Sequence, residues 1–335
     1  RCASQRRCRG SKTITTADHR FMAAALALAE RGVGQTGLNP SVGCIIVKEG
    51  IVVGRGWTQK GGRPHAEAMA LAHAGSAAQG SVMYVTLEPC AHQSDRGPAC
   101  AVLIMDARPA RVVVALQDPD PRTAGEGIKM LMAAGIAVET GVMASEARKS
   151  LAGFLSRMQR RRPFVTLKIA TSLDGQIAMA DGSSRWITGD IARAHSHIER
   201  ARTDIILVGS GTVKADAPQL NVRLTGLEHR SPRKVMLGSG DAPDGWEIIR
   251  APADIAKLDC NNLMVEGGAA TATAFLKAGL VDRLLLYRAP IFIGAGKACL
   301  GDIGLGQLSD AHGLWQLSDS RSLGKDRLEV YERAN

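Results

Sequence analysis

The sequence predicts two α/β domains in one chain. The chain has 335 residues, which is more than a single hydrophobic core usually supports. Candidate strands and helices alternate along both halves, and this pattern is typical of α/β folds. Between the halves, apolar residues at helical spacing run into the basic stretch 160–162, and Pro163 ends the pattern. We therefore expect a linker helix and a solvated basic linker at residues 146–163.

The first half begins with a capped helix. Thr15 and Asp18 form a candidate capping box for a helix that continues to about Arg31. Glu49-Gly50 indicates the turn of a β-hairpin, and Pro98 favours the first turn of a later helix. The expected strands lie at 41–47, 51–57, 82–87, 111–116 and 136–140, and the remaining helices lie at 65–74, from about 98, and at 126–134.

The second half repeats the alternation. Gly267-Gly268 is typical of a tight turn before a helix at 269–278, and backbone N–H groups at such a helix start favour a dinucleotide phosphate, although a plain strand-to-helix connection fits these residues equally well. Gly209 to Thr212 is a second candidate of this kind. The apolar segment 284–293 is a candidate edge strand through which a homo-oligomer would form. The expected strands lie at 164–170, 204–208, 234–237, 262–265 and 282–290.

Composition argues against several classes of function. No apolar run approaches the roughly 20 residues of a membrane-spanning helix, so we expect no membrane partner. The seven cysteines are odd in number and scattered, which favours reduced cytoplasmic thiols and metal binding over disulfides. The net charge of +10 suits nucleic acid or phosphorylated small molecules. With only three Tyr and five Phe, a stripe for single-stranded nucleic acid is missing, so we favour the small molecule. Residues 1–14 are basic without a following apolar stretch, and we expect a disordered extension rather than a secretory signal.

One group of residues in the first half has the composition of a catalytic zinc site. His65, Cys90 and Cys100 offer an imidazole and two thiolates, which leaves the fourth tetrahedral position open. Glu67 follows the histidine by two residues near the start of the same helix. Zinc lowers the pKa of a bound water, and we expect Glu67 to carry protons during attack on an amine-bearing ring carbon. Zinc nucleobase deaminases share the H-x-E and P-C patterns, although their two cysteines are usually separated by two residues rather than nine.

These motifs resemble those of the bifunctional riboflavin-biosynthesis enzymes, which combine a diaminohydroxyphosphoribosylaminopyrimidine deaminase with a 5-amino-6-(5-phosphoribosylamino)uracil reductase. The similarity covers nearly all of residues 15–335, and the motifs occur in the order of the family. In the first half the similar stretches are Asn39–Gly43, Pro64–Glu67, Thr86–His92 and Gln117–Pro121. In the second half they are Leu167–Lys168, Ser172–Gly175, Trp186–Thr188, Gly211–Val213, Asp216–Leu220 with Arg223, and Val265–Gly268.

The resemblance implies a fold and an activity for each domain. Residues 15–145 would form a cytidine-deaminase-like three-layer domain that binds Zn²⁺ and deaminates 2,5-diamino-6-ribosylamino-4(3H)-pyrimidinone 5′-phosphate. Residues 164–335 would form a dihydrofolate-reductase-like domain that binds NADPH. That domain would transfer a hydride to C1 of the imine-form ribose and open it to ribityl, with the cofactor supplying the chemistry.

The resemblance also implies which residues contact the ligands. In the deaminase, Asn39 and Asp118 would hold pyrimidine and ribose groups, with Asp120 beside them, and Arg96 would lie near the substrate phosphate. In the reductase, the implied substrate contacts are Ser184, Arg200, Leu220, Arg223 and Glu266. The two arginines are candidate phosphate clamps because a guanidinium matches phosphate bidentately. The implied NADPH contacts are Ala170, Trp186, Thr212, Asp216, Ser239, Gly268, Ala269, Ala270, Thr271, Ala272, Thr273 and Ala274.

The chain departs from the family at several positions. Asp120 stands where the family often has Asn, Thr58 where it often has His, and the loop from Ala91 to Cys100 is one residue longer. Family members usually have a longer stretch where this chain has Gly240–Val265, enough for another strand and helix. An active deaminase with a weak or inactive reductase domain is therefore an alternative.

Two further alternatives stand beside this interpretation. A nucleic-acid deaminase would share H-A-E and P-C, but it would pair its cysteines as C-x-x-C and lack a second domain of this kind. A non-catalytic zinc-stabilised module would have no use for Glu67, which is not a ligand. On the residues alone, Asn39-Pro40 also fits a plain turn, Asp118–Pro121 a rigid loop, and Trp186 a core position.

Overall fold

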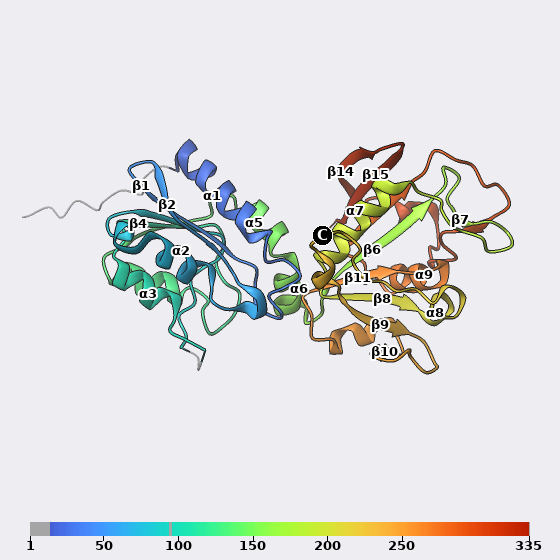
Figure 1. Cartoon of the computed structure of the whole chain (residues 1–335), viewed down its shortest axis with the longest axis horizontal. Coiled ribbons are helices and arrows are strands. Elements are labelled where there is room, and N and C mark those ends of the chain that lie inside the picture. Colours follow the sequence, from blue (N-terminus) through green and yellow to red (C-terminus); the bar gives the residue numbers. More distant parts are fainter. Residues whose placement is uncertain (1–13, 94–95, 335) are drawn as a thin grey trace, which may run out of the picture. The chain divides into compact units, whose positions relative to one another are not determined.

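The computed structural model describes residues 14–93 and 96–334. The chain divides into two compact units between Ala152 and Gly153, and each unit is built on its own α/β sheet (Figure 1). Two α/β domains are thus confirmed. The expected N-terminal extension 1–14 lies outside the described residues, apart from residue 14.

The described residues of the first unit form a five-stranded sheet in the order β2-β1-β3-β4-β5. β1 pairs antiparallel with β2 and β3, whereas β3, β4 and β5 run parallel. The strands are β1 (Gly43–Lys48), β2 (Ile51–Trp57), β3 (Val82–Val85), β4 (Arg111–Val114) and β5 (Ala137–Thr140). The helices are α1 (Thr16–Ala29), α2 (Ala66–Ala74), α3 (Cys100–Ala107), α4 (Glu126–Ala133) and α5 (Ala144–Ser150), with 3₁₀ turns at Lys60–Gly62 and Gly75–Ala78.

Two glycines let helices lie directly on opposite faces of this sheet. A Cβ at Gly43 would stand 1.8 Å from the Ala25 carbonyl oxygen in α1, and one at Gly56 would stand 2.3 Å from the Ala66 carbonyl oxygen in α2. Gly56 pairs with Cys44, the neighbour of Gly43, and successive residues of a strand face opposite sides. α1 and α2 therefore form the outer layers of a three-layer unit, and Gly56 fixes where α2 begins.

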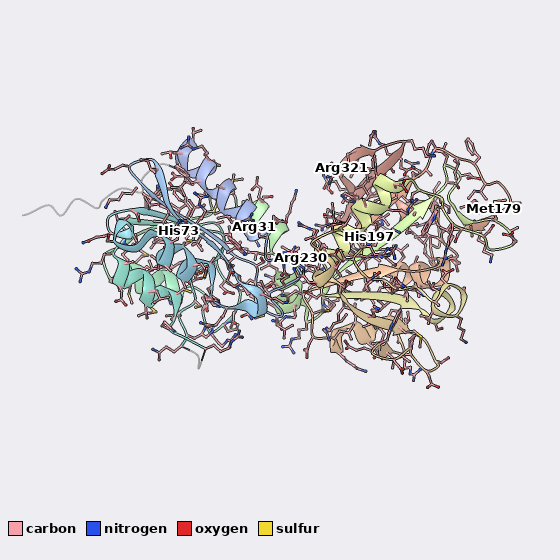
Figure 2. All side chains as sticks on the ribbon, viewed as in Figure 1. Arg31, His73, Met179, His197, Arg230 and Arg321 are labelled. Atoms are coloured by element: carbon pink, nitrogen blue, oxygen red, sulfur yellow. The ribbon has the colours of Figure 1, made fainter. Side chains whose placement is uncertain are left out.

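The described residues of the second unit form an eight-stranded sheet in the order β10-β9-β8-β11-β6-β12-β15-β14. The strands from β10 to β12 run parallel, and the β14–β15 hairpin adds to β12 antiparallel. His197 lies on α7 in this unit (Figure 2). The strands are β6 (Phe164–Thr171), β8 (Ile205–Gly209), β9 (Arg233–Leu237), β10 (Glu247–Ile249), β11 (Asn262–Glu266), β12 (Arg283–Arg288), β14 (Trp315–Leu323) and β15 (Asp326–Arg333), and β7 (Gln176–Ala178) pairs separately with β13 (Lys297–Ala298). The helices are α6 (Ala152–Arg160), α7 (Asp190–Ala201), α8 (Ser210–Asp216) and α9 (Ala269–Lys277), with 3₁₀ turns at Glu228–Arg230, Pro252–Lys257 and Leu308–Ala311.

The segment 284–293 is not an edge strand, which corrects the expectation from its apolar composition. β12 lies between β6 and β15, because the C-terminal hairpin covers the edge that β12 would otherwise expose. The chain leaves the sheet after Arg288, and Phe292 is 78% exposed. The edges of this sheet, within the described residues, are β10 and β14. The short segment 240–265 nevertheless contains a strand, β10, and the 3₁₀ turn Pro252–Lys257, because three residues suffice to continue the sheet beside β9.

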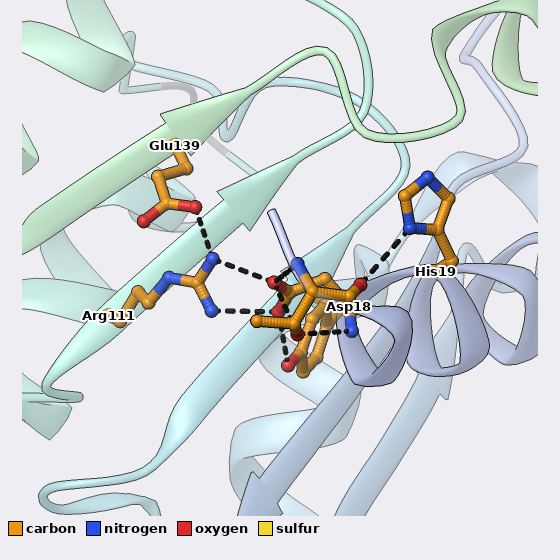
Figure 3. Close-up of polar contacts among 6 residues, drawn as sticks. Asp18, His19, Arg111 and Glu139 are labelled. Atoms are coloured by element: carbon orange, nitrogen blue, oxygen red, sulfur yellow. Dashed lines mark hydrogen bonds and ion pairs between the residues drawn. The ribbon is translucent and has the colours of Figure 1, made fainter. Parts of the chain in front are cut away.

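A buried polar network joins the start of α1 to the sheet (Figure 3). The predicted capping box is confirmed, since Thr15 N donates to the Asp18 carboxylate at 2.8 Å and Asp18 N donates to Thr15 Oγ1 at 3.2 Å. Arg111 in β4 donates to Asp18 at 2.7 Å and also pairs with Glu139 in β5. Tyr84 Oη donates to Asp18 at 2.9 Å. Although burial opposes ionisation, these hydrogen bonds lower the pKa of Asp18, so the network holds no uncompensated buried charge.

Candidate zinc and cofactor sites

The three predicted zinc ligands come together at the starts of two helices. His65 is the N-cap of α2, Cys100 is the first residue of α3, and Cys90 lies in the loop after β3. His65 Nδ1 lies 3.6 Å from Cys90 Sγ and 3.3 Å from Cys100 Sγ, and the three ligand atoms all lie within 4.8 Å of one another. Around a tetrahedral zinc ion, nitrogen and sulfur ligands are separated by about 3.5 Å. The donor set therefore fits Zn²⁺ in both chemistry and spacing.

The surroundings of the two thiols favour one thiolate. The Cys100 thiol donates a hydrogen bond that lowers the pKa of Cys90 to about 4, and His65 adds to this effect. The backbone N–H of Cys100, at the start of α3, also donates to Cys90 Sγ at 3.3 Å. The same pairing and burial raise the pKa of Cys100. Because cysteine binds metal as the thiolate, Cys90 is prepared as a ligand by the fold itself.

Glu67 lies inside the same site. It is the second residue of α2 and only 3% exposed. Burial raises the pKa of Glu67 to about 7, although the nearby His65 opposes this shift. A carboxyl group with this pKa can both take up and return a proton near neutral pH.

Two of the predicted deaminase substrate residues contact the turn that precedes His65. A Cβ at Gly62 would stand 2.0 Å from Asn39 Nδ2, so the Asn39 side chain lies against this turn. Arg96 Nη2 donates to the Gly61 carbonyl at 2.8 Å. The side chains of Asn39 and Arg96 therefore both contact the 60–62 turn. This turn ends three residues before the zinc ligand His65.

The other two lie in the loop after β4. Asp118 and Asp120 are 8% and 7% exposed. Burial raises the pKa of Asp118 to about 6, and the negative charges of Asp120, Glu88 and Cys90 add to this shift. Hydrogen bonds from Arg122 lower the pKa of Asp120. Asp118 therefore has a pKa close enough to neutral for its protonation to change there, whereas Asp120 stays ionised.

The sequence did not indicate Glu88 as a site residue. This side chain is 3% exposed and accepts backbone N–H groups from Asp118 at 3.2 Å, Gly125 at 3.0 Å and Ile128 at 3.2 Å. It therefore ties the loop that carries Asp118 to the segment that carries Cys90. Its position two residues before Cys90 was visible, but its partners lie 30 to 40 residues away in the sequence.

A cavity of about 590 Å³ opens in the second unit, within the usual range for ligand pockets. All five predicted reductase substrate residues line it, namely Ser184, Arg200, Leu220, Arg223 and Glu266. The predicted NADPH contacts that line it are Ala170, Trp186, Thr212, Asp216, Gly268, Ala269, Ala270 and Thr271. The predicted contacts outside its lining are Ser239, Ala272, Thr273 and Ala274. Of these four, Ala272 is buried in the hydrophobic core, and Thr273 Oγ1 accepts the backbone N–H of Gly301 at 2.8 Å.

Glu266 is held by two cations at the floor of this cavity. Arg200 binds it bidentately, with Nε–Oε1 at 2.7 Å and Nη2–Oε2 at 2.9 Å, and Lys168 Nζ lies 3.7 Å from Oε2. Although burial opposes ionisation, Lys168 and Arg200 lower the pKa of Glu266 to about 2. Arg200 Nη1 donates to the Asn221 carbonyl at 3.1 Å. Arg200 is thus engaged by protein partners, whereas Arg223 is exposed at the cavity.

Two glycines keep the cavity open where a dinucleotide would pass. A Cβ at Gly211 would meet no atom within 4 Å, and one at Gly268 would meet only Thr212 Oγ1, at 3.8 Å. Both glycines line the cavity, so any side chain there would project into it. Gly268 N donates to Thr212 Oγ1 at 3.2 Å, which joins the two predicted cofactor loops. Trp186 is 64% exposed with Arg193 packed 4.7 Å from its ring centre, so it is a cavity residue rather than a core residue.

Lys168, Tyr287 and His197 are among the other residues that line the cavity and to which the sequence analysis assigned no role. Lys168 was part of a family-like stretch, and Tyr287 lies in β12 with its hydroxyl 2.8 Å from His195 Nδ1. Burial, with Arg200 and Arg223, lowers the pKa of His197 to about 4. Its Nδ1 accepts the backbone N–H of Arg223 at 3.3 Å. The i,i+3 spacing of His197 and Arg200 on one helix face was the signal that could have found it.

The first unit therefore has the site of a zinc-dependent hydrolytic deaminase, and the second has a cavity lined by all the predicted substrate residues and most of the predicted cofactor residues of a reductase. Comparison with known proteins agrees with both. Residues 15–116 match the family described as the cytidine and deoxycytidylate deaminase zinc-binding region, and residues 163–328 match the RibD C-terminal domain. The chain belongs to the RibD family of riboflavin biosynthesis proteins and is a bifunctional deaminase and reductase that uses zinc and NADPH.

The similarity extends over the full length of several relatives. Riboflavin biosynthesis protein RibD of Haemophilus influenzae is 40% identical, with 91% of this chain and 95% of the relative covered. The Escherichia coli protein is 38% identical, with 92% and 97% covered. The structure of Acinetobacter baumannii RibD, form 1, matches with a TM-score of 0.87 at 36% identity, covering 95% of this chain and 99% of that one. A diaminohydroxyphosphoribosylaminopyrimidine deaminase/5-amino-6-(5-phosphoribosylamino)uracil reductase from Thermotoga maritima matches with a TM-score of 0.85 at 29% identity, covering 95% and 99%.

No helix among residues 14–93 and 96–334 is both long and apolar enough to cross a membrane.

Proposed function

We propose that this chain first deaminates 2,5-diamino-6-ribosylamino-4(3H)-pyrimidinone 5′-phosphate and then reduces 5-amino-6-(5-phosphoribosylamino)uracil to its ribityl form. The observation that carries the proposal is the pairing of two sites in one chain. The first combines the His65, Cys90 and Cys100 donors with buried Glu67. The second is a cavity whose buried Glu266 is held ionised by Lys168 and Arg200.

In the deaminase, His65, Cys90 and Cys100 hold the zinc ion. Zinc, when bound, supplies an acidified water for attack on the ring carbon that bears the amine. Glu67 takes up the proton of the attacking water and passes protons to the ring nitrogen and to the leaving amine.

Four further residues hold the deaminase substrate. Asn39 and Asp118 bind the pyrimidine and ribose groups, and Asp120 with its Arg122 partner fixes the loop beside them. Arg96, tethered to the Gly61 carbonyl, faces the substrate phosphate. Asn39 and Arg96 both contact the short turn at 60–62. This common position supports a substrate whose ring lies at the zinc site and whose phosphate lies at the edge of that site, near Arg96.

In the reductase, NADPH supplies the hydride. Glu266 stays ionised and accepts hydrogen bonds from the substrate, while Arg200 orients its carboxylate. Arg223 binds the phosphate, since its guanidinium is exposed at the cavity. Ser184 and Leu220 complete the substrate contacts. The residues that would hold the cofactor are Ala170, Trp186, Thr212, Asp216, Ser239 and the start of α9 from Gly268 to Thr271, with Ala272, Thr273 and Ala274 further along that helix.

We also propose that the protein works in the cytoplasm as a homo-oligomer and does not bind nucleic acid. The five cysteines within the described residues are free, which fits a reducing compartment. The second unit exposes Phe292 and Leu308, each 78% accessible, and exposed apolar side chains of this size favour association. The net charge of +10 needs no nucleic-acid partner to explain it, since the pyrimidine substrate and NADPH both carry phosphate.

The direct test follows both reactions in one sample. Zinc-replete protein is incubated with the diaminopyrimidinone substrate while ammonia release and NADPH oxidation are recorded. Equal amounts of both are expected. Ammonia without NADPH oxidation would favour an inactive reductase domain, and an absence of ammonia would contradict the deaminase assignment.

The role of Glu67 is tested by Glu67→Gln. We expect ammonia release to fall by about 10²-fold or more, the usual contribution of a proton-transferring group, while the zinc content stays at one ion per chain. Exposed Glu146 on α5 provides the matched control, since Glu146→Gln makes the same change of charge outside the site. Full ammonia release by Glu67→Gln would show that another group moves the protons.

A further inference from the structure

Four neighbouring strands of the second unit end along one edge of the sheet. β11, β8, β9 and β10 are adjacent and parallel. In their register Gly209 stands beside Leu237, and Leu237 beside Ile249. Because the carboxyl ends of parallel strands meet at the same edge, the residues that follow them form a row. Along the sheet, this row runs Gly267, Ser210, Gly238, Arg250.

The cofactor cavity covers only the first part of this row. Gly267, Gly209 and Gly211 line it, whereas the loop after β9 does not. That loop is nevertheless in contact with the cavity wall, since a Cβ at Gly238 would stand 2.5 Å from Ser210 Oγ. The row therefore continues from the cavity across β9 to β10, over about 10 Å at the usual strand spacing of about 4.8 Å.

The direction in which we place NADPH along the row follows from Glu266, a proposed substrate contact, and from Lys168, which pairs with it. Glu266 at the end of β11 and Lys168 in β6 lie at the β6–β11 side of the cavity. The nicotinamide must lie next to the substrate, so the adenosine end extends the other way, toward β9 and β10. Arg250, the residue after β10, stands at the far end of that path.

Arg250 is held in place by backbone carbonyls. Its Nη1 donates to the carbonyl oxygens of Gly238 at 2.8 Å and Gly240 at 3.3 Å. Its backbone N–H donates to Asp254, whose carboxylate also pairs with Lys257. In the part of the chain that the structure describes, Nε and Nη2 of Arg250 have no other hydrogen-bond acceptor, and the residue is exposed. A guanidinium fixed at one nitrogen and open at the other two is organised to bind a phosphate.

We propose that Arg250 binds the 2′-phosphate of the NADPH adenosine and makes the reductase select NADPH over NADH. Arg250 lies within the segment between the predicted cofactor contact Ser239 and the substrate contact Glu266. This inference rests on the use of NADPH by the second unit and adds the residue that distinguishes the two nicotinamide cofactors.

The test compares cofactors that differ only in the 2′-phosphate. NADPH and NADH are titrated into wild-type protein and Arg250→Ala while nicotinamide fluorescence is followed, and 2′,5′-ADP and 5′-AMP are compared by calorimetry. Loss of a hydrogen-bonded charge pair weakens binding by about tenfold or more. We expect that loss for NADPH and 2′,5′-ADP, with NADH and 5′-AMP unchanged. Arg327→Ala is the control, because it removes an exposed arginine from β15, which lies toward the opposite edge of the sheet from β10. It should change the affinity for none of the four ligands.

Separate outcomes distinguish this inference from the cofactor assignment. Wild-type protein that binds neither nicotinamide cofactor would overturn both. A preference for NADPH that persists in Arg250→Ala, or an equal loss of NADPH and NADH, would overturn only the role of Arg250. Arg250→Gln keeps a donor for the Gly238 carbonyl but removes the charge, so it should show the same selective loss even where Arg250→Ala disturbs the loop.

Discussion

Two buried glutamates show how neighbouring charges set the chemistry of a single residue. Glu67 is 3% exposed and Glu266 is 8% exposed, so burial disfavours the charged form of both. Glu266 has Lys168 and Arg200 beside it, and its pKa falls to about 2. Among the described residues, no such pair of cations surrounds Glu67: burial raises its pKa to about 7, His65 opposes this shift, and the charge of Cys90 adds to it. Glu266 is therefore a permanent acceptor, whereas Glu67 can exchange a proton during a reaction.

His197 should make the stability of the second unit depend on pH. Its pKa of about 4 in the folded state lies below the ordinary value of 6.5, so the fold favours neutral imidazole. The stabilisation is complete above pH 6.5 and is lost as the pH falls toward 4, because the unfolded chain then binds the proton more readily. His197→Asn keeps an acceptor for the Arg223 backbone N–H and cannot titrate.

Between pH 6.5 and pH 4 we expect wild-type protein to lose roughly 1–3 kcal/mol more stability than His197→Asn. Unfolding by urea at several pH values, followed by tryptophan fluorescence, measures this difference. Trp186, Trp246 and Trp315 lie in the second unit and only Trp57 lies in the first, so the signal reports mainly on the relevant unit. Parallel pH profiles for the two proteins would contradict the prediction.

At the scale of elements, the sequence predicted those parts of the fold whose signals are local. The Thr15–Asp18 capping box begins α1 as expected, and Glu49 and Gly50 both adopt positive φ in the predicted hairpin turn. α7 was missed because its buried face consists of Ala192, Ser196, His197 and Ala201, which form no apolar stripe. β14 was missed because it is a mostly exposed edge strand without alternation. Its pairing with β15 depends on tertiary contacts that a local pattern does not contain.

The candidate sites also differ in how much of them a local sequence pattern could predict. The spacing of His65, Glu67 and Cys90 indicated a metal site from the residues alone, because each side chain has a distinct ligand or proton-transfer chemistry. The cavity residues of the second unit required a resemblance, since arginines and glycines occur in many surroundings. Glu88 escaped both approaches because its role is to accept three backbone N–H groups from a distant loop.

The close contact of α2 with β2 predicts that Gly56→Ala will disturb the zinc site. The new Cβ would stand 2.3 Å from the Ala66 carbonyl oxygen and 2.7 Å from the Ala70 nitrogen. These are backbone atoms, so the start of α2 must move and carry His65 and Glu67 with it. We expect a stability loss of about 1–3 kcal/mol and, because the ligand geometry changes, a zinc affinity lower by about 10-fold or more.

Competition with a chromophoric chelator measures the zinc affinity of the variant. Gly240→Ala is a suitable control, because a Cβ there meets no atom within 4 Å and the residue lies in the other unit. An unchanged zinc affinity in Gly56→Ala would mean that α2 can shift without moving its ligand.

At the scale of the whole molecule, each unit contains a complete set of candidate groups for one reaction. His65, Glu67, Cys90 and Cys100 all precede the division at Ala152, and the residues that line the cofactor cavity run from Lys168 to Cys299. Both proposed ligands carry phosphate, and this gives the net charge of +10 a common purpose in the two units. The bifunctional enzyme is therefore a covalent pairing of two sites that use different chemistry.

This arrangement predicts that removing zinc will separate the two activities. A strong chelator should abolish ammonia release, because the three donors in the first unit would lose the ion that supplies the acidified water. NADPH affinity should not change, since the described residues contribute no first-unit side chain to the cavity lining. Ammonia release and the nicotinamide fluorescence titration are measured before chelation, after it, and after zinc is restored. Recovery of ammonia release with zinc would exclude irreversible unfolding. A parallel fall in NADPH affinity on chelation would show instead that the metal site in one unit controls the cofactor site in the other.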